Sequence, residues 1–191
     1  RKSCRICGSS SAAASGACEP GRGWLPRRFS FVQPPLALMH DPGSLKGADD
    51  VARVLDRWIT QGKRIAVYGD YDADGMTSTA LLLRALAALG AAPRAAIPSR
   101  MEEGYGLNPS MVDRQHRDGV QILVTVDNGV AASAALRRAA ELGMEVIVTD
   151  HHTIPDQPAP MTALIHPATT PEGSPYRGLA GVGLAYVLAR A

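Results

Sequence analysis

The sequence is poor in aromatic residues and contains no long hydrophobic run. Phe, Trp and Tyr make up 5% of its 191 residues, and the apolar content leans on Ala, Leu and Val. This composition favours helices and tightly packed α/β layers over an aromatic-rich β-sandwich. No stretch of about 20 apolar residues occurs, which excludes a membrane-spanning helix. The basic first residues are not followed by the apolar segment of a secretory signal.

Cysteine is also scarce, with three residues that all lie near the start of the chain. An odd number confined to one segment argues against a disulfide framework and fits a reducing, cytoplasmic compartment. Cys4 and Cys7 have the spacing of half a zinc site, which Cys18 and His40 would have to complete. Structural zinc sites normally use two tight ligand pairs, so free thiols are the simpler interpretation.

Charge is unevenly distributed along the chain. Residues 1–40 carry six Lys and Arg against one acid, whereas residues 41–191 have a net charge of −3. Charge alone therefore gives no reason to expect nucleic-acid binding. We interpret residues 1–34, rich in Ser, Gly, Ala, Pro and Arg, as a disordered or non-native leader. Because the chain starts at Arg1 and stops within a helical pattern, we expect one domain over 35–191, truncated at its C-terminus.

From residue 48 onward, helical and strand-like hydrophobic patterns alternate. Apolar residues spaced by three and four between Val51 and Ile59 predict a helix, capped by Asp49 or Asp50 and ended by Gly62. Further elements are expected as helices over 77–89, 109–117 and 131–142, and as strands over 65–68, 94–97, 122–126, 145–149 and 163–165. Continuously apolar strands that alternate with helices predict an α/β fold, with a mostly parallel sheet and helices on both faces.

Acidic residues and histidines follow three of the predicted strands. These segments are Asp70-Tyr71-Asp72-Ala73-Asp74-Gly75, Asp127-Asn128-Gly129 and Asp150-His151-His152. The carboxyl ends of parallel strands meet at one edge of a sheet, where so many acids need compensation by cations. Carboxylates with one or two imidazoles suit Mn²⁺ or Mg²⁺, and two such ions that share a carboxylate act on phosphoesters. Asp127 stands alone at a central strand end and is the best candidate for that bridge.

Taken alone, each segment has a simpler interpretation. The spacing from Asp70 to Gly75 opens like an EF-hand loop, but its twelfth position is Leu81 and a strand precedes it. A solvated acidic turn, an ordinary Asp-Asn-Gly turn and a helix cap with surface imidazoles explain the three segments separately, but they explain their joint placement poorly. The predicted helix after Gly75 opens with residues 77–79, which suit either phosphate binding or simple capping.

The motifs at the strand ends resemble those of the DHH phosphoesterase superfamily. Within it, the chain is similar to the RecJ single-strand-specific exonucleases over about residues 35–191. The discriminating segment is Met101-Glu102-Glu103-Gly104-Tyr105-Gly106-Leu107-Asn108. The lead-in at residues 38–46 and the glycine-rich turn at residues 178–183 are similar as well.

This resemblance implies a 5′→3′ exonuclease that hydrolyses single-stranded DNA in repair and recombination, with two Mn²⁺ or Mg²⁺ ions. Further partners would be a single-strand-binding protein and a helicase. The implied metal ligands are Asp70, Asp72, Asp74, Asp127 and His151. The implied catalytic residues are Asp127, His151 and His152, while Asp150 would orient a histidine. The candidates for substrate binding are Arg100, Tyr105 and Gly106, although a surface Arg and a packed core Tyr are simpler readings of the first two.

The chain departs from the pattern of this family in several respects. The family's fourth metal-binding Asp and second domain would follow residue 191, and His166-Pro167 stands where Asn-Pro is expected. We therefore expect an incomplete site with little activity of its own. Two alternatives stay open. One is a DHH phosphodiesterase acting on short oligonucleotides or cyclic dinucleotides, which would lack the 101–108 segment. The other is a non-catalytic replication scaffold, which would have lost metal ligands.

Overall fold

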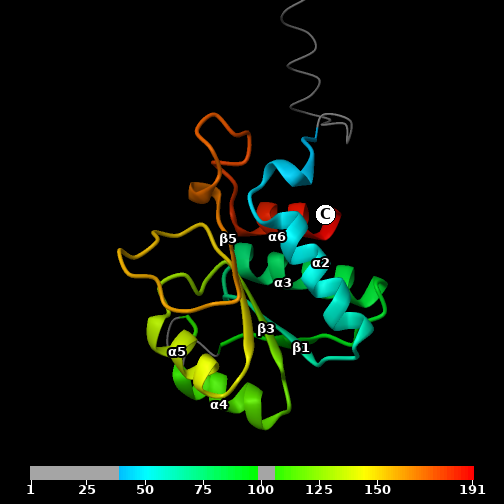
Figure 1. Cartoon of the computed structure of the whole chain (residues 1–191), viewed down its shortest axis with the longest axis vertical. Coiled ribbons are helices and arrows are strands. Elements are labelled where there is room, and N and C mark those ends of the chain that lie inside the picture. Colours follow the sequence, from blue (N-terminus) through cyan, green and yellow to red (C-terminus); the bar gives the residue numbers. More distant parts are fainter. Residues whose placement is uncertain (1–38, 99–105) are drawn as a thin grey trace, which may run out of the picture. The chain divides into compact units, whose positions relative to one another are not determined.

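The computed structural model describes residues 39–98 and 106–191 (Figure 1). The predicted leader at 1–34, the predicted domain start at residue 35, and the substrate-binding candidates Arg100 and Tyr105 lie outside the described residues. From His40 onward, the chain clusters as one compact unit. Within the described ranges, no helix combines the length and the apolar character that crossing a membrane requires.

Helices and strands alternate along the described chain. The helices are α2 (Ala48–Thr60), α3 (Ala73–Ala88), α4 (Pro109–Arg117), α5 (Ser133–Glu141) and α6 (Gly181–Arg190), with short 3-10 turns η2 (Pro42–Ser44) and η3 (Pro167–Thr169). The strands are β1 (Ile65–Tyr68), β2 (Arg94–Ala96), β3 (Ile122–Val126), β4 (Glu145–Thr149) and β5 (Ala163–Ile165). The predicted bounds of β1, β3, β4, β5 and α4 are confirmed, and β2 is one residue shorter than expected.

The five strands form one sheet in the order β2-β1-β3-β4-β5. All four pairings are parallel, with Ile65 opposite Ile122 and Val126 opposite Thr149. Strand β3 occupies the centre, and the carboxyl ends of all five strands therefore share one edge. The fold class expected from the sequence is confirmed.

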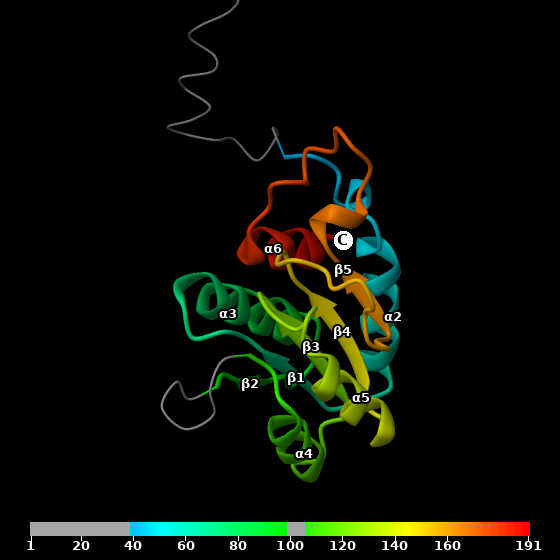
Figure 2. The ribbon, with the colours of Figure 1, turned by 90° about the vertical axis from the view of Figure 1, so that its left-hand side faces the viewer.

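Helices cover both faces of this sheet (Figures 1 and 2). Ile65 and Val67 of β1 belong to the core that includes buried residues of α2, α3 and α6. Ala66 and Tyr68 belong to the core on the other face, with α4 and α5. Because successive side chains of a strand point to opposite faces, a strand buried on both faces must be apolar at every position. This is why the strands read as continuous hydrophobic runs.

Three helix starts differ from expectation, and the smallest difference is that α5 begins at Ser133 rather than at 131. Helix α2 follows Gly47, which has a left-handed φ of 86° and offers no side-chain cap, so Asp49 and Asp50 lie in the first turn instead. Helix α3 begins at Ala73, four residues before the predicted start at 77. Residues 77–79 therefore lie in its second turn, where their hydroxyls donate to carbonyl oxygens one turn earlier. The prediction that residues 77–79 form the first turn, either to bind phosphate or to cap the helix, is thus wrong.

The cause of the early start of α3 is the side chain of Asp72. Its Oδ1 accepts the N–H of Gly75 at 2.8 Å, which is the N-cap hydrogen bond preferred by Asp. Gly75 lies inside the helix rather than in the predicted loop. A side chain would not fit there, because a Cβ would lie 2.5 Å from the Asp70 backbone nitrogen. The glycine thus permits a close approach of helix and strand end.

Candidate metal centre

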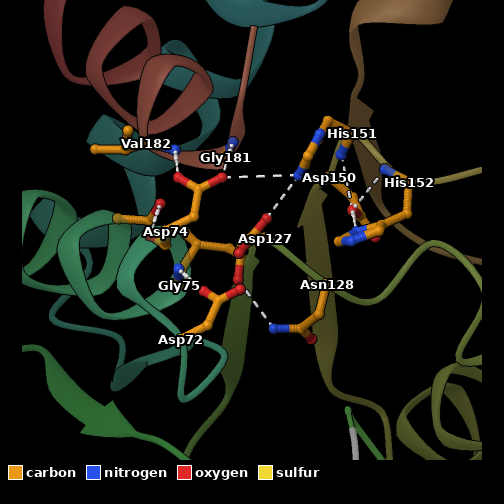
Figure 3. Close-up of polar contacts among 12 residues, drawn as sticks. Asp72, Asp74, Gly75, Asp127, Asn128, Asp150, His151, His152, Gly181 and Val182 are labelled. Atoms are coloured by element: carbon orange, nitrogen blue, oxygen red, sulfur yellow. Dashed lines mark hydrogen bonds and ion pairs between the residues drawn. The ribbon is translucent and has the colours of Figure 1, made fainter.

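The acidic and histidine segments meet at the carboxyl edge of the sheet (Figure 3). Asp70 follows β1, and Asp72 and Asp74 sit at the start of α3. Asp127 follows the central strand β3, while Asp150, His151 and His152 follow β4. Three strand ends that are far apart in sequence therefore supply one cluster, as the parallel topology requires.

Asp127 and His151 form the centre of this cluster. Oδ1 of Asp127 lies 2.9 Å from Nε2 of His151, and Oδ2 of Asp74 lies 3.7 Å from the same nitrogen. One potential ligand atom each from Asp127, His151 and His152 lie within 4.8 Å of one another. A carboxylate and two imidazoles at this spacing form a donor set for a divalent transition metal.

The surroundings of the Asp127 carboxyl group disfavour its negative charge when no cation is bound. Burial and the negative charges of Asp74 and Asp72 raise its pKa from 3.8 to about 6, and the two neighbouring histidines offset this only partly. The backbone of Asp127 is in the left-handed region, with φ of 61°, as no other described non-glycine residue is. Such outliers cluster at functional sites, and here the turn places a carboxylate at the end of the central strand.

Asp150 holds the following histidines rather than facing the cluster's centre. Its Oδ1 accepts the N–H groups of His151 and His152 and lies 2.7 Å from Nδ1 of His152, while Oδ2 accepts the N–H of Val130. Burial lowers the pKa of His152, but the hydrogen bond and charge of Asp150 outweigh it, with smaller contributions from Asp127 and Asp70, so the net pKa is raised. Asp150 therefore orients His152, which leaves Nε2 of that ring for other contacts.

Asp70 lies farther from the centre of the cluster than the ligand atoms of Asp127, His151 and His152. It is buried, and its Oδ1 accepts the N–H of Tyr71 at 2.7 Å. It does not belong to the group of closely spaced ligand atoms among the described residues. Its charge nevertheless reaches the site, since it contributes to the raised pKa of His152. Asp72 is exposed at the site's rim and caps α3.

Helix α6 reaches into the site through its first amides. The N–H of Gly181 donates to Oδ2 of Asp74 and that of Val182 donates to Oδ1, both at 2.7 Å. A helix N-terminus stabilises a carboxylate through such bonds and through its dipole. Sequence reasoning singled out the glycine-rich turn but assigned it no role at the site. The sequence feature that could have indicated such a role is Gly181, because a glycine at the start of a helix lets the helix end approach other residues closely.

His166, where the family pattern expects Asn, has two well-defined partners. Nδ1 accepts the N–H of Ala168 at 3.1 Å and so caps η3. Nε2 donates to the carbonyl oxygen of His152 at 2.6 Å. Asn also caps helices in this way. The second ring nitrogen of His166 adds a hydrogen bond to the backbone of the segment after β4, which carries the two histidines of the site. Gly106, the described substrate-binding candidate, accepts a hydrogen bond from the Tyr68 hydroxyl through its carbonyl oxygen.

Comparison with known proteins identifies the family. The DHH family, N-terminal domain, matches residues 64–191, which include every strand and all three motifs. The chain belongs to the DHH family. The resemblance inferred from the motifs at the strand ends is confirmed by this match.

Among DHH proteins, the chain is similar to RecJ exonucleases. It is 46% identical over 162 residues to the single-stranded-DNA-specific exonuclease RecJ of Thermus thermophilus, covering 85% of this chain and 23% of that protein. The corresponding Escherichia coli enzyme is 43% identical over 145 residues, covering 75% of this chain and 25% of the enzyme. The chain thus spans about a quarter of the length of these relatives.

Solved structures agree with this placement. A structure of exonuclease RecJ bound to manganese has a TM-score of 0.69 and 46% identity, covering 81% of this chain and 38% of that one. Thermus thermophilus RecJ in complex with Mn²⁺ has a TM-score of 0.64 and 43% identity, covering 82% and 21%. CDC45 from Entamoeba histolytica, with a TM-score of 0.51 and 15% identity over 75% and 29% of the two chains, shares the fold alone.

Proposed function

We propose that this chain carries most of the metal ligands of a nuclease that hydrolyses single-stranded DNA from its 5′ end. The observation that carries the proposal is the cluster of Asp127, His151 and His152 at the carboxyl edge of the sheet, with ligand atoms within 4.8 Å of one another. Single-strand specificity and the choice of Mn²⁺ or Mg²⁺ are taken from the RecJ relatives, whose names and structures include them.

The residues fit a divalent cation in chemistry as well as in spacing, and the second ion is taken from the resemblance. The pKa of Asp127 is raised because its carboxylate is buried beside those of Asp74 and Asp72, and a cation between them would relieve that repulsion. We assign Asp127 as the bridging ligand, since it lies between the α3 carboxylates and the histidines (Figure 3). Asp70, Asp72, Asp74 and His151 complete the proposed ligand set. His152 is close enough to Asp127 and His151 to be a ligand as well, but we assign it to the substrate.

The remaining residues of the site orient these ligands and the substrate. Bound Mn²⁺ or Mg²⁺ would supply Lewis acidity toward the phosphodiester and a hydroxide nucleophile at neutral pH. His152 is held through Nδ1 by Asp150, whose hydrogen bond and charge raise the pKa of the ring more than burial lowers it. We assign its Nε2–H the role of donating to a phosphoryl oxygen, where negative charge develops. Helix α6 fixes both oxygens of Asp74.

The test measures Mn²⁺ binding and DNA hydrolysis in the full-length protein and in this 191-residue chain. Titration calorimetry counts the ions bound, and single-stranded DNA labelled at the 5′ or the 3′ end reports direction. We expect the full-length protein to bind two ions and to release labelled mononucleotide first from the 5′-labelled strand. The shorter chain should bind more weakly and hydrolyse little.

A matched pair of variants separates the metal centre from general effects of charge. Asp127→Asn should abolish hydrolysis and lower the number of ions bound. Asp118→Asn removes an acid near Arg94, the first residue of β2, at the amino edge of the sheet, and should leave both unchanged. Cleavage restricted to very short oligonucleotides or cyclic dinucleotides would favour a phosphodiesterase instead. Absence of metal binding in the full-length protein would favour a non-catalytic scaffold.

Three further statements rest on the resemblance and remain predictions. We propose that residues 35–191 form a DHH domain that is truncated at its C-terminus, that it works in the cytoplasm, and that a single-strand-binding protein and a helicase are partners. Co-purification of the full-length protein with each candidate partner, with and without single-stranded DNA, would test the last of these. Direct interaction without DNA is the expected outcome.

A further inference from the structure

A cavity of about 330 Å³ opens directly beside the candidate metal centre. It shares Asp150 and His152 with that centre, and the turn after β3 and residues 106–107 form its other walls. Small-molecule sites have volumes of about 300–1,000 Å³, so the cavity is large enough for one small ring system. None of the metal-ligand assignments made above uses the cavity.

The walls of the cavity are mostly uncharged. Leu107, Val130 and Ala132 contribute aliphatic surface, and Gly129 contributes backbone. The one acid in the lining, Asp150, is 1% exposed and has hydrogen bonds to both of its oxygens. Among the described residues, no Lys or Arg lines the cavity. These walls suit a flat, uncharged group better than a phosphate, which would find its counter-charge at the metal centre.

Asn128 is one of the lining residues and carries an unsatisfied acceptor. The residue is 5% exposed, and its Nδ2 donates to the carbonyl oxygens of Val126 and Tyr68. Its Oδ1 is buried and has no hydrogen-bond partner among the described residues. In Figure 3 the amide nitrogen faces the carboxylates and the oxygen points away from them. A buried acceptor without a donor is costly, so a ligand that brings an N–H group is favoured here.

We propose that this cavity is the subsite for the nucleobase of the nucleotide being removed, and that Asn128 Oδ1 accepts an N–H group from that base. The inference rests on the proposed nuclease function, since it places the phosphate of the same nucleotide at Asp127 and His151. A nucleobase matches the cavity because it is flat, uncharged and edged with N–H donors. The adjacent His152 ring offers a face for stacking.

The experiment compares DNA substrates that differ only at the 5′-terminal nucleotide. One substrate carries adenine there, one carries unsubstituted purine, which lacks the amino group, and one is abasic. A strand with its abasic position in the middle serves as the matched control. With the full-length protein, the terminal abasic strand should have a KM about tenfold or more above that of the adenine strand. The purine strand should lie between them, about threefold to tenfold above adenine.

Filling the cavity should remove this preference. Ala132→Phe places a ring at the cavity wall, whereas Ala134→Phe places one on an exposed position of α5 that does not line it. We expect Ala132→Phe to process adenine-ended and abasic-ended strands alike, at the rate that the unmodified protein shows on the abasic strand. That unchanged rate on the abasic strand also demonstrates folding. The Ala134→Phe variant should keep the preference.

The possible outcomes separate this inference from the function on which it rests. Equal KM values for adenine-ended and abasic-ended strands, with metal-dependent cleavage intact, would overturn the nucleobase subsite alone. A preference that survives Ala132→Phe would overturn it as well, because the base would then bind elsewhere. Absence of any metal-dependent cleavage of single-stranded DNA would overturn the proposed function, and the subsite with it.

Discussion

The imidazole of His166 ties the loop after β4 to the turn after β5 through a 2.6 Å hydrogen bond to the carbonyl oxygen of His152. Its other nitrogen caps η3. The bond geometry defines the neutral tautomer with hydrogen on Nε2. A residue that stands where the resemblance predicts Asn therefore keeps the cap and adds a second contact, next to a histidine proposed to act on the substrate.

Replacing His166 dissects these two contacts. His166→Asn should retain the cap but lose the bond to His152, which costs about 1 kcal/mol of unfolding free energy. His166→Ala should lose both and cost about 2 kcal/mol or more. Urea unfolding measures the two values. Equal destabilisation by both variants would show that the cap contributes nothing.

Asp72 combines a helix cap with a proposed metal ligand, and serine separates the two roles. Asp72→Ser keeps an oxygen that accepts the N–H of Gly75, so stability should change by less than about 0.5 kcal/mol. Mn²⁺ affinity should fall about tenfold or more, because the carboxylate is gone. Asp72→Ala should lose both properties. Unchanged Mn²⁺ affinity in the serine variant would remove Asp72 from the ligand set.

The raised pKa of Asp127 predicts how the metal-free protein responds to pH. Its pKa is about 6 when folded and 3.8 ordinarily, so the folded state holds this proton more tightly. The contribution of Asp127 to stability is therefore full below about pH 4 and is lost as pH rises through 6. Asp127→Asn does not titrate, and Asn tolerates the left-handed backbone.

The measurement compares unfolding free energies of the two proteins in chelator from pH 4 to pH 7. Relative to the unmodified protein, Asp127→Asn should gain up to roughly 3 kcal/mol across that range. Saturating Mn²⁺ should reverse the order at pH 7, since the unmodified protein binds the ions more tightly than Asp127→Asn does. A difference that does not vary with pH would contradict the assignment of the raised pKa.

Gly181 faces Asp127 so closely that a Cβ would lie 2.7 Å from its Oδ1. Gly181→Ala should displace either the carboxylate or α6, lowering stability by about 1–3 kcal/mol and weakening Mn²⁺ binding. Gly183→Ala adds the same methyl group to the first turn of α6, but it meets only the Leu179 side chain, at 2.9 Å. Calorimetric titration of both variants should show the loss of affinity at Gly181 alone.

Much of the sheet was predictable because its strands are buried on both faces. The apolar run Ile122–Val126 ends where Asp127 begins, and Asn108-Pro109 marks a cap followed by the first residue of α4. The start of α3 was not predictable, because an Asp-rich stretch with glycine suits a turn as well as a helix cap. The Asp72 side chain decided it, by accepting the N–H of Gly75 as the cap of the helix.

The partners of individual site residues depended still more on the folded chain. The sequence indicated that Asp150 would orient a histidine, but only the structure shows that the ring is that of His152. No local pattern indicated that Asp74 receives two amides from residues 107 and 108 positions later. Asn128 looked like part of an ordinary turn, and its unsatisfied oxygen emerges only when its surroundings are complete.

The hydrogen bonds from α6 to Asp74 couple the position of this helix to the geometry of the proposed metal centre. Both carboxylate oxygens are held by rigid backbone amides, with no rotatable side chain between the helix and the ligand. A tilt or slide of α6 therefore moves Asp74 by a comparable distance, and metal coordination tolerates little such displacement. Any displacement of this helix would therefore change the geometry of the proposed metal centre, because Asp74 is one of its proposed ligands.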